Sequence, residues 1–201
     1  MPGLKSKKAL CESMAPFLFY NGSFMFSALE TSRLHLAEVI PSDARAMYSY
    51  ASNPEITRYM GWATHRSVGE SELTIRWFMG EARAQRACCV GIWRRDDGLF
   101  LGSTGWGFDQ GPELAVTGWI LRGDAHRQGY ASEAVGAMMA QAFRLWPKLM
   151  VFEATIHPDN TASSRLALKL GMLDTGETRP LLAPNLDGMV HDLRVFRLER
   201  P

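Results

Sequence analysis

A strand, a tight turn and a helix follow one another between residues 114 and 142, and this succession limits the folds open to the chain. Residues 114–121 form an apolar run typical of a strand. From Ala131 onward, apolar or small residues recur at offsets of three, four, seven, eight and eleven, which predicts a helix with one apolar face. Gly129 and Ala131 lie in the turn between them, where small residues let a ligand approach the backbone closely.

The start of this predicted helix is suited to binding an anion. The first N–H groups of a helix have no acceptor within it, and they lie at the positive end of its dipole. We therefore predict a phosphate-binding turn in which the N–H groups of Arg127, Gly129 and Ala131 are donors and the Arg127 side chain adds charge. The alternative is an ordinary loop that carries a surface arginine.

Four motifs carry a resemblance to a known family. The turn, residues 126–131, resembles the R/Q-x-x-G-x-G/A motif by which GNAT N-acetyltransferases bind acyl-CoA, with His126 where Arg or Gln is usual. The other three motifs occur in the family's order, at residues 29–34, 159–164 and 169–172. Over residues 29–199 the chain is similar to the branch that contains the ribosomal-protein N-terminal (alanine) acetyltransferases.

The resemblance implies the GNAT fold, an α/β (α+β) arrangement with a central mixed, mostly antiparallel sheet of about seven strands, splayed at the cofactor cleft. About four helices are expected on the two faces of the sheet. The residue pattern agrees with this order. Strands are predicted at 34–39, 87–94, 99–108, 114–121, 149–156, 172–177 and 191–198. Helices are predicted after Pro41 with Ser42 as N-cap, at 67–83, at 131–146, and from Pro158 to Gly171.

Length and composition fit one domain with an extension before it. The chain has 201 residues, of which 46% are hydrophobic, enough for one core. We assign residues 1–28 to an N-terminal extension and residues 29–201 to the acetyltransferase domain. If the extension is ordered, we expect its aromatic residues to pack on this domain or on a second subunit in a homodimer. These residues are Phe17, Phe19, Tyr20, Phe24 and Phe26.

Several classes of protein receive no support. The net charge of +1 gives no reason to expect nucleic acid as a partner, and no apolar run reaches the roughly 20 residues of a membrane span. Three cysteines do not make a disulfide framework, and the five histidines lack the spacing of metal ligands. We therefore predict a cytoplasmic protein with no metal site.

The resemblance implies acetyl-CoA as the cofactor. Its diphosphate would be bound by the turn, which comprises His126, Arg127, Gln128, Gly129, Tyr130, Ala131 and Ser132. Its pantetheine arm would lie between the strands at 114–121 and 149–156, against the backbone of Ile120, Leu121 and Arg122. Asn160 would either hold this arm near the thioester or cap the helix that follows it, and the two roles are compatible.

The resemblance also implies catalytic residues. Ser163 is expected near the CoA sulfur, where it can protonate the leaving thiolate, or it is simply a small helix residue. Ala167 stands where many GNAT enzymes have a tyrosine acid, and Val116 stands where many relatives have a glutamate. Glu153 is the first candidate for a substitute base, and its alternative is a charge in a buried hydrogen-bond network. Further candidates for the base are Glu113, Asp192 and His157.

From these features we predict an acetyl-CoA-dependent N-acetyltransferase that acts by direct attack in a ternary complex. The acceptor would be a primary amine, either a protein N-terminal α-amine or a small molecule. The missing glutamate favours a weakly basic acceptor, because an α-amine of pKa about 7.7–8.0 is about one-tenth neutral at pH 7 and needs less help from a base. The alternative is a catalytically impaired module that binds acyl-CoA and acts as a sensor or interaction protein.

Overall fold

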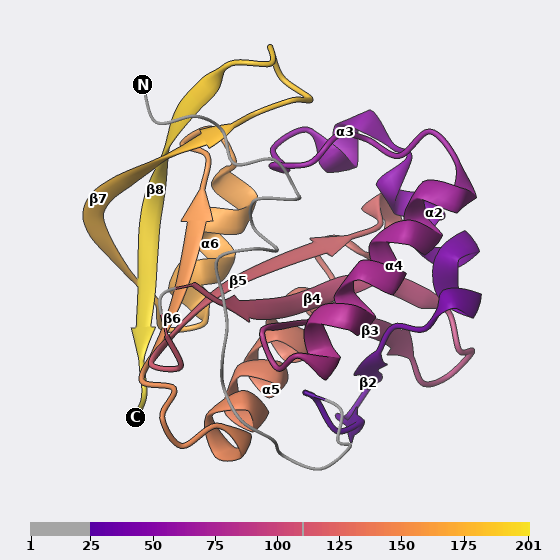
Figure 1. Cartoon of the computed structure of the whole chain (residues 1–201), viewed down its shortest axis with the longest axis horizontal. Helices are drawn as coiled ribbons and strands as arrows, with labels where there is room; N and C mark the ends of the chain where they lie inside the picture. The colour runs from indigo at the N-terminus through magenta and orange to yellow at the C-terminus, as the bar shows by residue number, and fades with distance from the viewer. Residues whose placement is uncertain (1–24, 110) are drawn as a thin grey trace.

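A twisted sheet of eight strands lies between two groups of helices in the computed structural model, which describes residues 25–109 and 111–201 (Figure 1). The strands are β1 (Leu29–Glu30), β2 (Leu34–Glu38), β3 (Ala87–Arg94), β4 (Phe100–Phe108), β5 (Leu114–Leu121), β6 (Val151–Ile156), β7 (Leu173–Leu182) and β8 (Val190–Glu199). The helices are α2 (Ala44–Ala51), α3 (Pro54–Thr57), α4 (Val68–Arg83), α5 (Tyr130–Leu145) and α6 (Thr161–Lys169). Short 3-10 turns lie at Pro41–Asp43 and Gly123–Ala125.

The sheet has the order β1-β2-β3-β4-β5-β6-β8-β7, and β5 and β6 are its one parallel pair. All the other pairs are antiparallel. The predicted GNAT arrangement of a mixed, mostly antiparallel sheet is therefore confirmed. The sheet has one strand more than predicted, because the two residues of β1 pair with β2.

Two apolar cores explain why helices cover both faces of the sheet. Helix α5 buries the apolar stripe predicted from the sequence, which includes Ala134, Val135, Met138 and Ala142, in the larger core. The smaller core lies under α2 and α4, where Met47 and Ile75 are fully or almost fully buried.

Neighbouring residues of one strand divide between these two cores. Cys88 belongs to the larger core and Cys89 to the smaller one, as the alternation of side chains along a strand predicts. Both thiols are buried and neither forms a disulfide, so these cysteines serve as packing residues.

Two predicted boundaries are wrong, the first for a local reason and the second because of strand pairing. Ser42 is not an N-cap, because the chain turns first as a 3-10 helix and the Asp43 carboxylate accepts the Ile40 N–H at 2.8 Å. Strand β7 continues five residues beyond the predicted end at residue 177, to Leu182. Its ladder with β8 resumes at Thr178 after an irregularity, and Pro180 is tolerated because β7 is an edge strand.

The last described part of the predicted extension packs on the domain, because Met25 and Phe26 belong to the larger core. Met25 is 1% exposed and Phe26 is 2% exposed, and the Phe26 ring meets Trp106 edge to face at 6.0 Å. The other predicted packing aromatics, Phe17, Phe19, Tyr20 and Phe24, lie outside the described residues. Among the helices of the described chain, none combines the length and the apolar character needed to span a bilayer.

One carboxylate fixes the first turn of α5 to the start of β2. Glu133 Oε1 accepts hydrogen bonds from the Thr31 hydroxyl at 2.7 Å, the Ser32 hydroxyl at 2.9 Å and the Arg33 N–H at 2.9 Å. Its Oε2 accepts from Arg33 Nε at 2.7 Å. Burial raises the pKa of Glu133, but these hydrogen bonds outweigh it and lower the pKa to about 2. The motif at 29–34 therefore positions α5.

Replacing Glu133 with Gln should lower the free energy of unfolding by about 2 kcal/mol at pH 7, because an amide supplies one acceptor oxygen where the carboxylate supplies two. Since the pKa is lower in the folded state, the carboxylate stabilises the fold above pH 4.5 and loses this effect as the pH falls towards about 2. Urea unfolding should show that the difference in free energy of unfolding between wild type and Glu133→Gln is smaller at pH 3 than at pH 7. The control Glu72→Gln, in the exposed pair with Arg76, should cost about 0.5 kcal/mol or less; an equal loss in both variants would contradict the prediction.

Candidate active site

The turn between β5 and α5 has the backbone shape of an anion-binding site. Arg127 has φ of 61° and Gly129 has φ of 81°, both in the left-handed region. Left-handed residues beside right-handed ones allow successive N–H groups to converge on one point. Within the described part of the chain, the N–H groups of residues 127–132 find no hydrogen-bond acceptor. The geometry thus agrees with the predicted phosphate site, where these groups are left free for a ligand.

Two side chains of the turn are used to hold its shape. His126 Nε2 donates to the Leu121 carbonyl at 3.0 Å, and Gln128 Nε2 donates to the Asp124 carbonyl at 2.6 Å. Their imidazole and amide groups are therefore occupied within the turn. His126 and Gln128 were predicted as cofactor ligands. They can contribute to cofactor binding by fixing the backbone shape of the turn, but these side-chain donors are already in use.

Arg33 is a feature of the turn that sequence reasoning missed. Its Nη1 donates to the Gln128 carbonyl at 2.9 Å, and its guanidinium lies 4.5 Å from the centre of the Tyr130 ring. A side chain at Gly129 would meet Arg33 Nη2 at 3.4 Å. A guanidinium held by its ion pair with Glu133 thus lies beside the free amides. The available signal was the 29–34 motif, which was identified without a role for its arginine.

Strands β5 and β6 separate just beyond the point where they pair. Their register covers Leu114–Val116 against Val151–Glu153, and no further pairs follow. A narrow cavity of about 60 Å³ lies between the unpaired parts. Its walls are Tyr59, Met60, Thr117, Gly118, Trp119, Ala154, Thr155, Ile156, His157, Asn160 and Ser163. The predicted gap between the two strands therefore exists, and it is lined by α6 and by the loop after α3.

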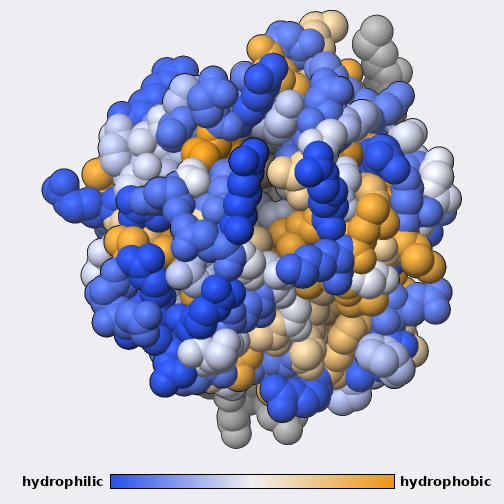
Figure 2. Space-filling view, turned by 180° about the vertical axis from the view of Figure 1, so that it is seen from behind, coloured by the Kyte–Doolittle hydropathy of each residue, from blue (hydrophilic) through white to orange (hydrophobic). Residues whose placement is uncertain are grey.

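The surface opposite the view of Figure 1 is mostly hydrophilic (Figure 2). It is hollowed near its middle, where apolar side chains show between hydrophilic ones, and more apolar side chains lie along one side (Figure 2).

The backbone of β5 faces the gap at alternate residues, which corrects two predicted contacts. The Arg122 N–H donates to the Leu101 carbonyl of β4 at 2.8 Å, and a side chain at Gly102 would collide with the Ile120 carbonyl. The backbone groups of Ile120 and Arg122 are therefore directed at β4 and cannot pair with a pantetheine arm in the gap. Alternation along the ladder leaves Trp119 and Leu121 to face it.

Asn160 caps α6 and still faces the cavity. Its Oδ1 accepts the Ser163 N–H at 3.2 Å, so the cap interpretation is confirmed. Its amide NH₂ has no acceptor among the described residues and remains available for a ligand. The Ser163 hydroxyl accepts from the Trp119 indole N–H at 3.3 Å, which leaves its own proton free to be donated. Trp119 is a second residue that sequence reasoning missed.

Glu153 is held as a carboxylate between two arginines and is 1% exposed. Arg179 donates through Nε at 2.7 Å and Nη2 at 3.1 Å, and Arg197 donates through Nε at 3.0 Å. Burial raises the pKa of Glu153, but these two partners outweigh it and the pKa is lowered. A buried carboxylate with a lowered pKa is a poor proton acceptor, and it is not among the cavity walls. The geometry favours the alternative interpretation, a charge within a buried network.

The other candidates for the base are no better placed. Glu113 precedes β5 at the end where β5 is paired with β6, and neither it nor Asp192 lines the cavity. His157 does line it, but its Nδ1 accepts the Asp159 N–H at 3.2 Å and its Nε2 lies 3.3 Å from His191 Nδ1. Both ring nitrogens are therefore engaged within the chain.

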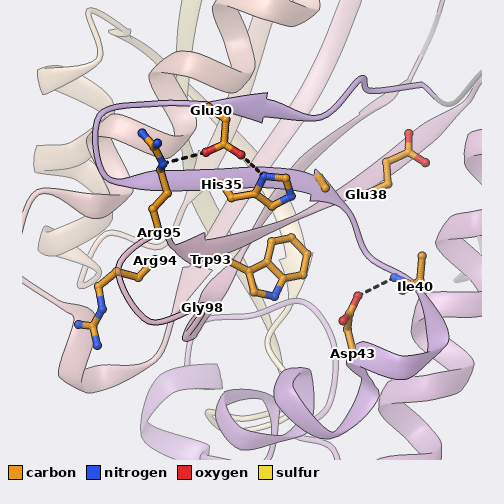
Figure 3. Close-up of a pocket in the computed structure, with 10 residues that line it drawn as sticks. Glu30, His35, Glu38, Ile40, Asp43, Trp93, Arg94, Arg95 and Gly98 are labelled. Atoms are coloured by element: carbon orange, nitrogen blue, oxygen red, sulfur yellow. Dashed lines mark hydrogen bonds and ion pairs between the residues drawn. The ribbon is translucent and has the colours of Figure 1, made fainter.

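A larger, open hollow of about 620 Å³ lies at the β1–β3 edge of the sheet (Figure 3). In it the Glu30 carboxylate lies between Arg95 and His35, and Asp43 accepts the Ile40 N–H (Figure 3). Its other charged side chains also have partners within the chain: Arg94 pairs with Asp97, and Glu38 accepts the Phe26 N–H. It is separated from the β5–β6 gap by β4 in the order of the sheet.

A helix start with free amides, next to a gap between two parallel strands, defines a class of protein that binds an anionic, elongated cofactor in a split sheet. Comparison with known families makes this specific. The family described as the acetyltransferase (GNAT) domain matches residues 33–173. The chain therefore belongs to the GNAT acetyltransferases, a family of enzymes.

Individual relatives agree with this assignment. The chain is 32% identical to the uncharacterized N-acetyltransferase YoaA of Bacillus subtilis over 178 residues, which are 88% of this chain and 99% of the relative. Among solved structures, the ribosomal L7/L12 alpha-N-protein acetyltransferase RimL in complex with coenzyme A superposes with a TM-score of 0.73 at 17% identity, covering 86% of this chain and 98% of that one. The spermidine N-acetyltransferase of Vibrio cholerae in complex with coenzyme A and spermine gives a TM-score of 0.70 at 14% identity, with coverage of 84% and 96%.

Replacing Gly129 with valine should abolish binding of CoA while the fold persists. A β-branched residue is strongly disfavoured at φ of 81°, so the turn must rearrange and its amides no longer converge. Calorimetry should show the affinity for CoA falling by at least about 100-fold. The matched control is Gly98→Val, which imposes a similar strain at φ of 70° in the β3–β4 hairpin. Unchanged affinity in Gly129→Val, or equal loss in both variants, would refute the assignment.

Proposed function

We propose that this chain is an acetyl-CoA-dependent N-acetyltransferase that transfers the acetyl group directly to a primary amine. The proposal rests on two neighbouring features. The amides of residues 127–132 have no acceptor among the described residues, and a gap opens beside this turn along β5. The first suits a diphosphate and the second suits an extended arm that ends in a thioester. Solved relatives in complex with coenzyme A or acetyl-CoA support the same cofactor.

In this proposal the turn, from His126 to Ser132, binds the diphosphate through its backbone amides, with Arg127 adding charge. The pantetheine arm lies along the gap and pairs with the edge of β5 at the backbone of Trp119 and at the Leu121 N–H, since the Leu121 carbonyl accepts from His126. The Asn160 NH₂ donates to a carbonyl of the arm. An amide of β5 that faces the gap polarises the thioester carbonyl and stabilises its developing negative charge.

The two thiols in the described part of the chain, Cys88 and Cys89, do not favour an acyl-enzyme. Burial raises the pKa of the Cys89 thiol to about 12 and that of Cys88 well above its ordinary value. Neither thiol lines the cavity between β5 and β6. Thiols that stay protonated are weak nucleophiles, so direct attack by the amine is the simpler route.

The acceptor in this proposal is an amine that is partly neutral without help, namely a protein N-terminal α-amine or a weakly basic small-molecule amine. The support is chemical: the carboxylates considered as bases are Glu153, which is ion-paired, and Glu113 and Asp192, which lie outside the cavity. Among the solved relatives, one is described as acting on a ribosomal-protein N-terminus and another on spermidine, which are one acceptor of each kind. The protein is further proposed to be cytoplasmic and to form a homodimer.

A panel of amines tests the proposal directly. With acetyl-CoA present, release of free CoA thiol should depend on the amine, and peptides with a free α-amine should react faster than the same peptides with a blocked N-terminus and one lysine. If CoA binds but no amine promotes thiol release, the chain is the impaired CoA-binding module that Val116 and Ala167 favour. If CoA does not bind, both functions are refuted.

Two substitutions at Asn160 separate capping from cofactor binding. Asn160→Asp keeps an oxygen for the Ser163 N–H but removes the NH₂ donors, so the melting temperature should hold while turnover or affinity for acetyl-CoA falls about 10-fold. Asn160→Ala should lose both the helix cap and the NH₂ donors, and its free energy of unfolding should fall by about 1 kcal/mol. Wild-type kinetics in Asn160→Asp would reduce Asn160 to a cap.

A further inference from the structure

Expulsion of a thiolate needs a proton, and few groups in the wall of the cavity can give one. The Thr117 hydroxyl already donates to the Gly105 carbonyl at 2.7 Å. Both ring nitrogens of His157 are engaged, and the Asn160 amide is not an acid. Ser163 and Thr155 carry aliphatic hydroxyls, which are much weaker acids than a phenol. The remaining proton donor in the wall is the phenol of Tyr59.

Tyr59 is placed in the cavity by contacts on its ring rather than on its hydroxyl. The ring stacks on His157, with centres 5.0 Å apart and planes inclined by 25°. The Arg58 guanidinium lies 5.6 Å from the centre of the same ring. Among the described residues the phenol oxygen has no hydrogen-bond partner. The ring is thus oriented while the hydroxyl is left for a ligand.

The loop that carries Tyr59 is fixed by one distant side chain. Asn185, in the connection between β7 and β8, accepts from the Thr64 N–H at 2.9 Å and from the Thr64 hydroxyl at 3.0 Å. Its NH₂ donates to the carbonyls of Thr57 and Trp62, each at 2.8 Å. Tyr59 lies between these attachment points along the chain. A catalytic group held in this way is ready before the substrate arrives.

We propose that Tyr59 is the general acid that protonates the sulfur of CoA as the thioester breaks. The proposal rests on the N-acetyltransferase function proposed above. It assigns the proton to a residue of the loop after α3, while α6 contributes Asn160 and Ser163 to the same cavity. Ser163, oriented by the Trp119 indole, contributes a hydrogen bond to the sulfur rather than the proton.

The neutral amine attacks the thioester carbon, a C–N bond forms and the C–S bond breaks. The electron pair of that bond goes to sulfur, which takes the phenolic proton of Tyr59 to give the free CoA thiol. The proton lost by the amine nitrogen passes through water and restores the phenol. The products are the amide and CoA, and Tyr59 is unchanged.

Tyr59→Phe tests the assignment because it removes the hydroxyl and keeps the stacked ring. With the best amine of the panel, kcat should fall about 100-fold. The KM for the amine and the affinity for acetyl-CoA should each stay within about 2-fold of wild type. A higher amine KM with unchanged kcat would mean that Tyr59 only shapes the acceptor pocket, and unchanged kinetics would mean that it does nothing; either result overturns the proposal.

Two comparisons complete the experiment. Tyr48→Phe removes a phenol from the exposed hydrogen bond to the Arg66 carbonyl, outside the cavity, and should leave kcat at the wild-type level. Ser163→Ala should lower kcat less than 10-fold, and a larger loss there than in Tyr59→Phe would overturn the division of roles. Absence of amine-dependent turnover in the wild type would refute the proposed function as well, whereas wild-type turnover with an undiminished Tyr59→Phe would refute this inference alone.

Discussion

Strands β5 and β6 share a parallel register at only three positions before they separate, and the cleft depends on this short pairing. Each strand remains well supported on its other side, β5 by β4 and β6 by β8, over most of its length. The sheet therefore behaves as two half-sheets, β1–β5 and β6–β8, joined at one end. Backbone groups past the junction lack partners within the sheet, and unpaired polar groups away from water are costly. A ligand with amide groups of its own can satisfy them, which is why a split sheet is a natural place for a pantetheine arm.

The junction itself is reinforced by a buried charge. Glu153 occupies the last paired position of β6, opposite Val116, and its two oxygens bind Arg179 of β7 and Arg197 of β8. Removing one partner from such a group leaves a buried charge uncompensated, which costs several kcal/mol. The network ties the outer strands to the point where the two halves meet. Glu153 is therefore better understood as part of the frame of the cleft than as part of its chemistry.

Much of the fold could be predicted because its signals are local. The apolar stripe of α5, Gly129 in the turn and the alternation around Cys88 and Cys89 each reflect a short-range rule. Apart from the Ser42 cap, which a local 3-10 turn replaces, the predictions that failed depend on long-range pairing. The extension of β7 past Pro180 depends on a partner strand, and the directions of Ile120 and Arg122 depend on which neighbour each backbone group meets.

The site shows the same division. Asn160 and Ser163 were found because they share one motif on one helix turn. Arg33 and Tyr59 lie more than 100 residues before them in the sequence and come to the site only through tertiary contacts. The roles of the charged residues could not be predicted either, because Glu153 differs from a free carboxylate only through arginines on two other strands.

The amide of Asn185 joins two loops that lie more than 100 residues apart in the sequence. An insertion or exchange in residues 57–64 would leave the Asn185 amide in the β7–β8 connection without its hydrogen-bond partners. A change in the β7–β8 connection would likewise leave backbone groups of residues 57–64 without theirs. Chimeras that transplant one of these loops from a homologue would then be expected to lose order in both. A change in one loop should therefore require a matching change in the other, and anyone redesigning this part of the domain would need to treat the two loops as a single unit.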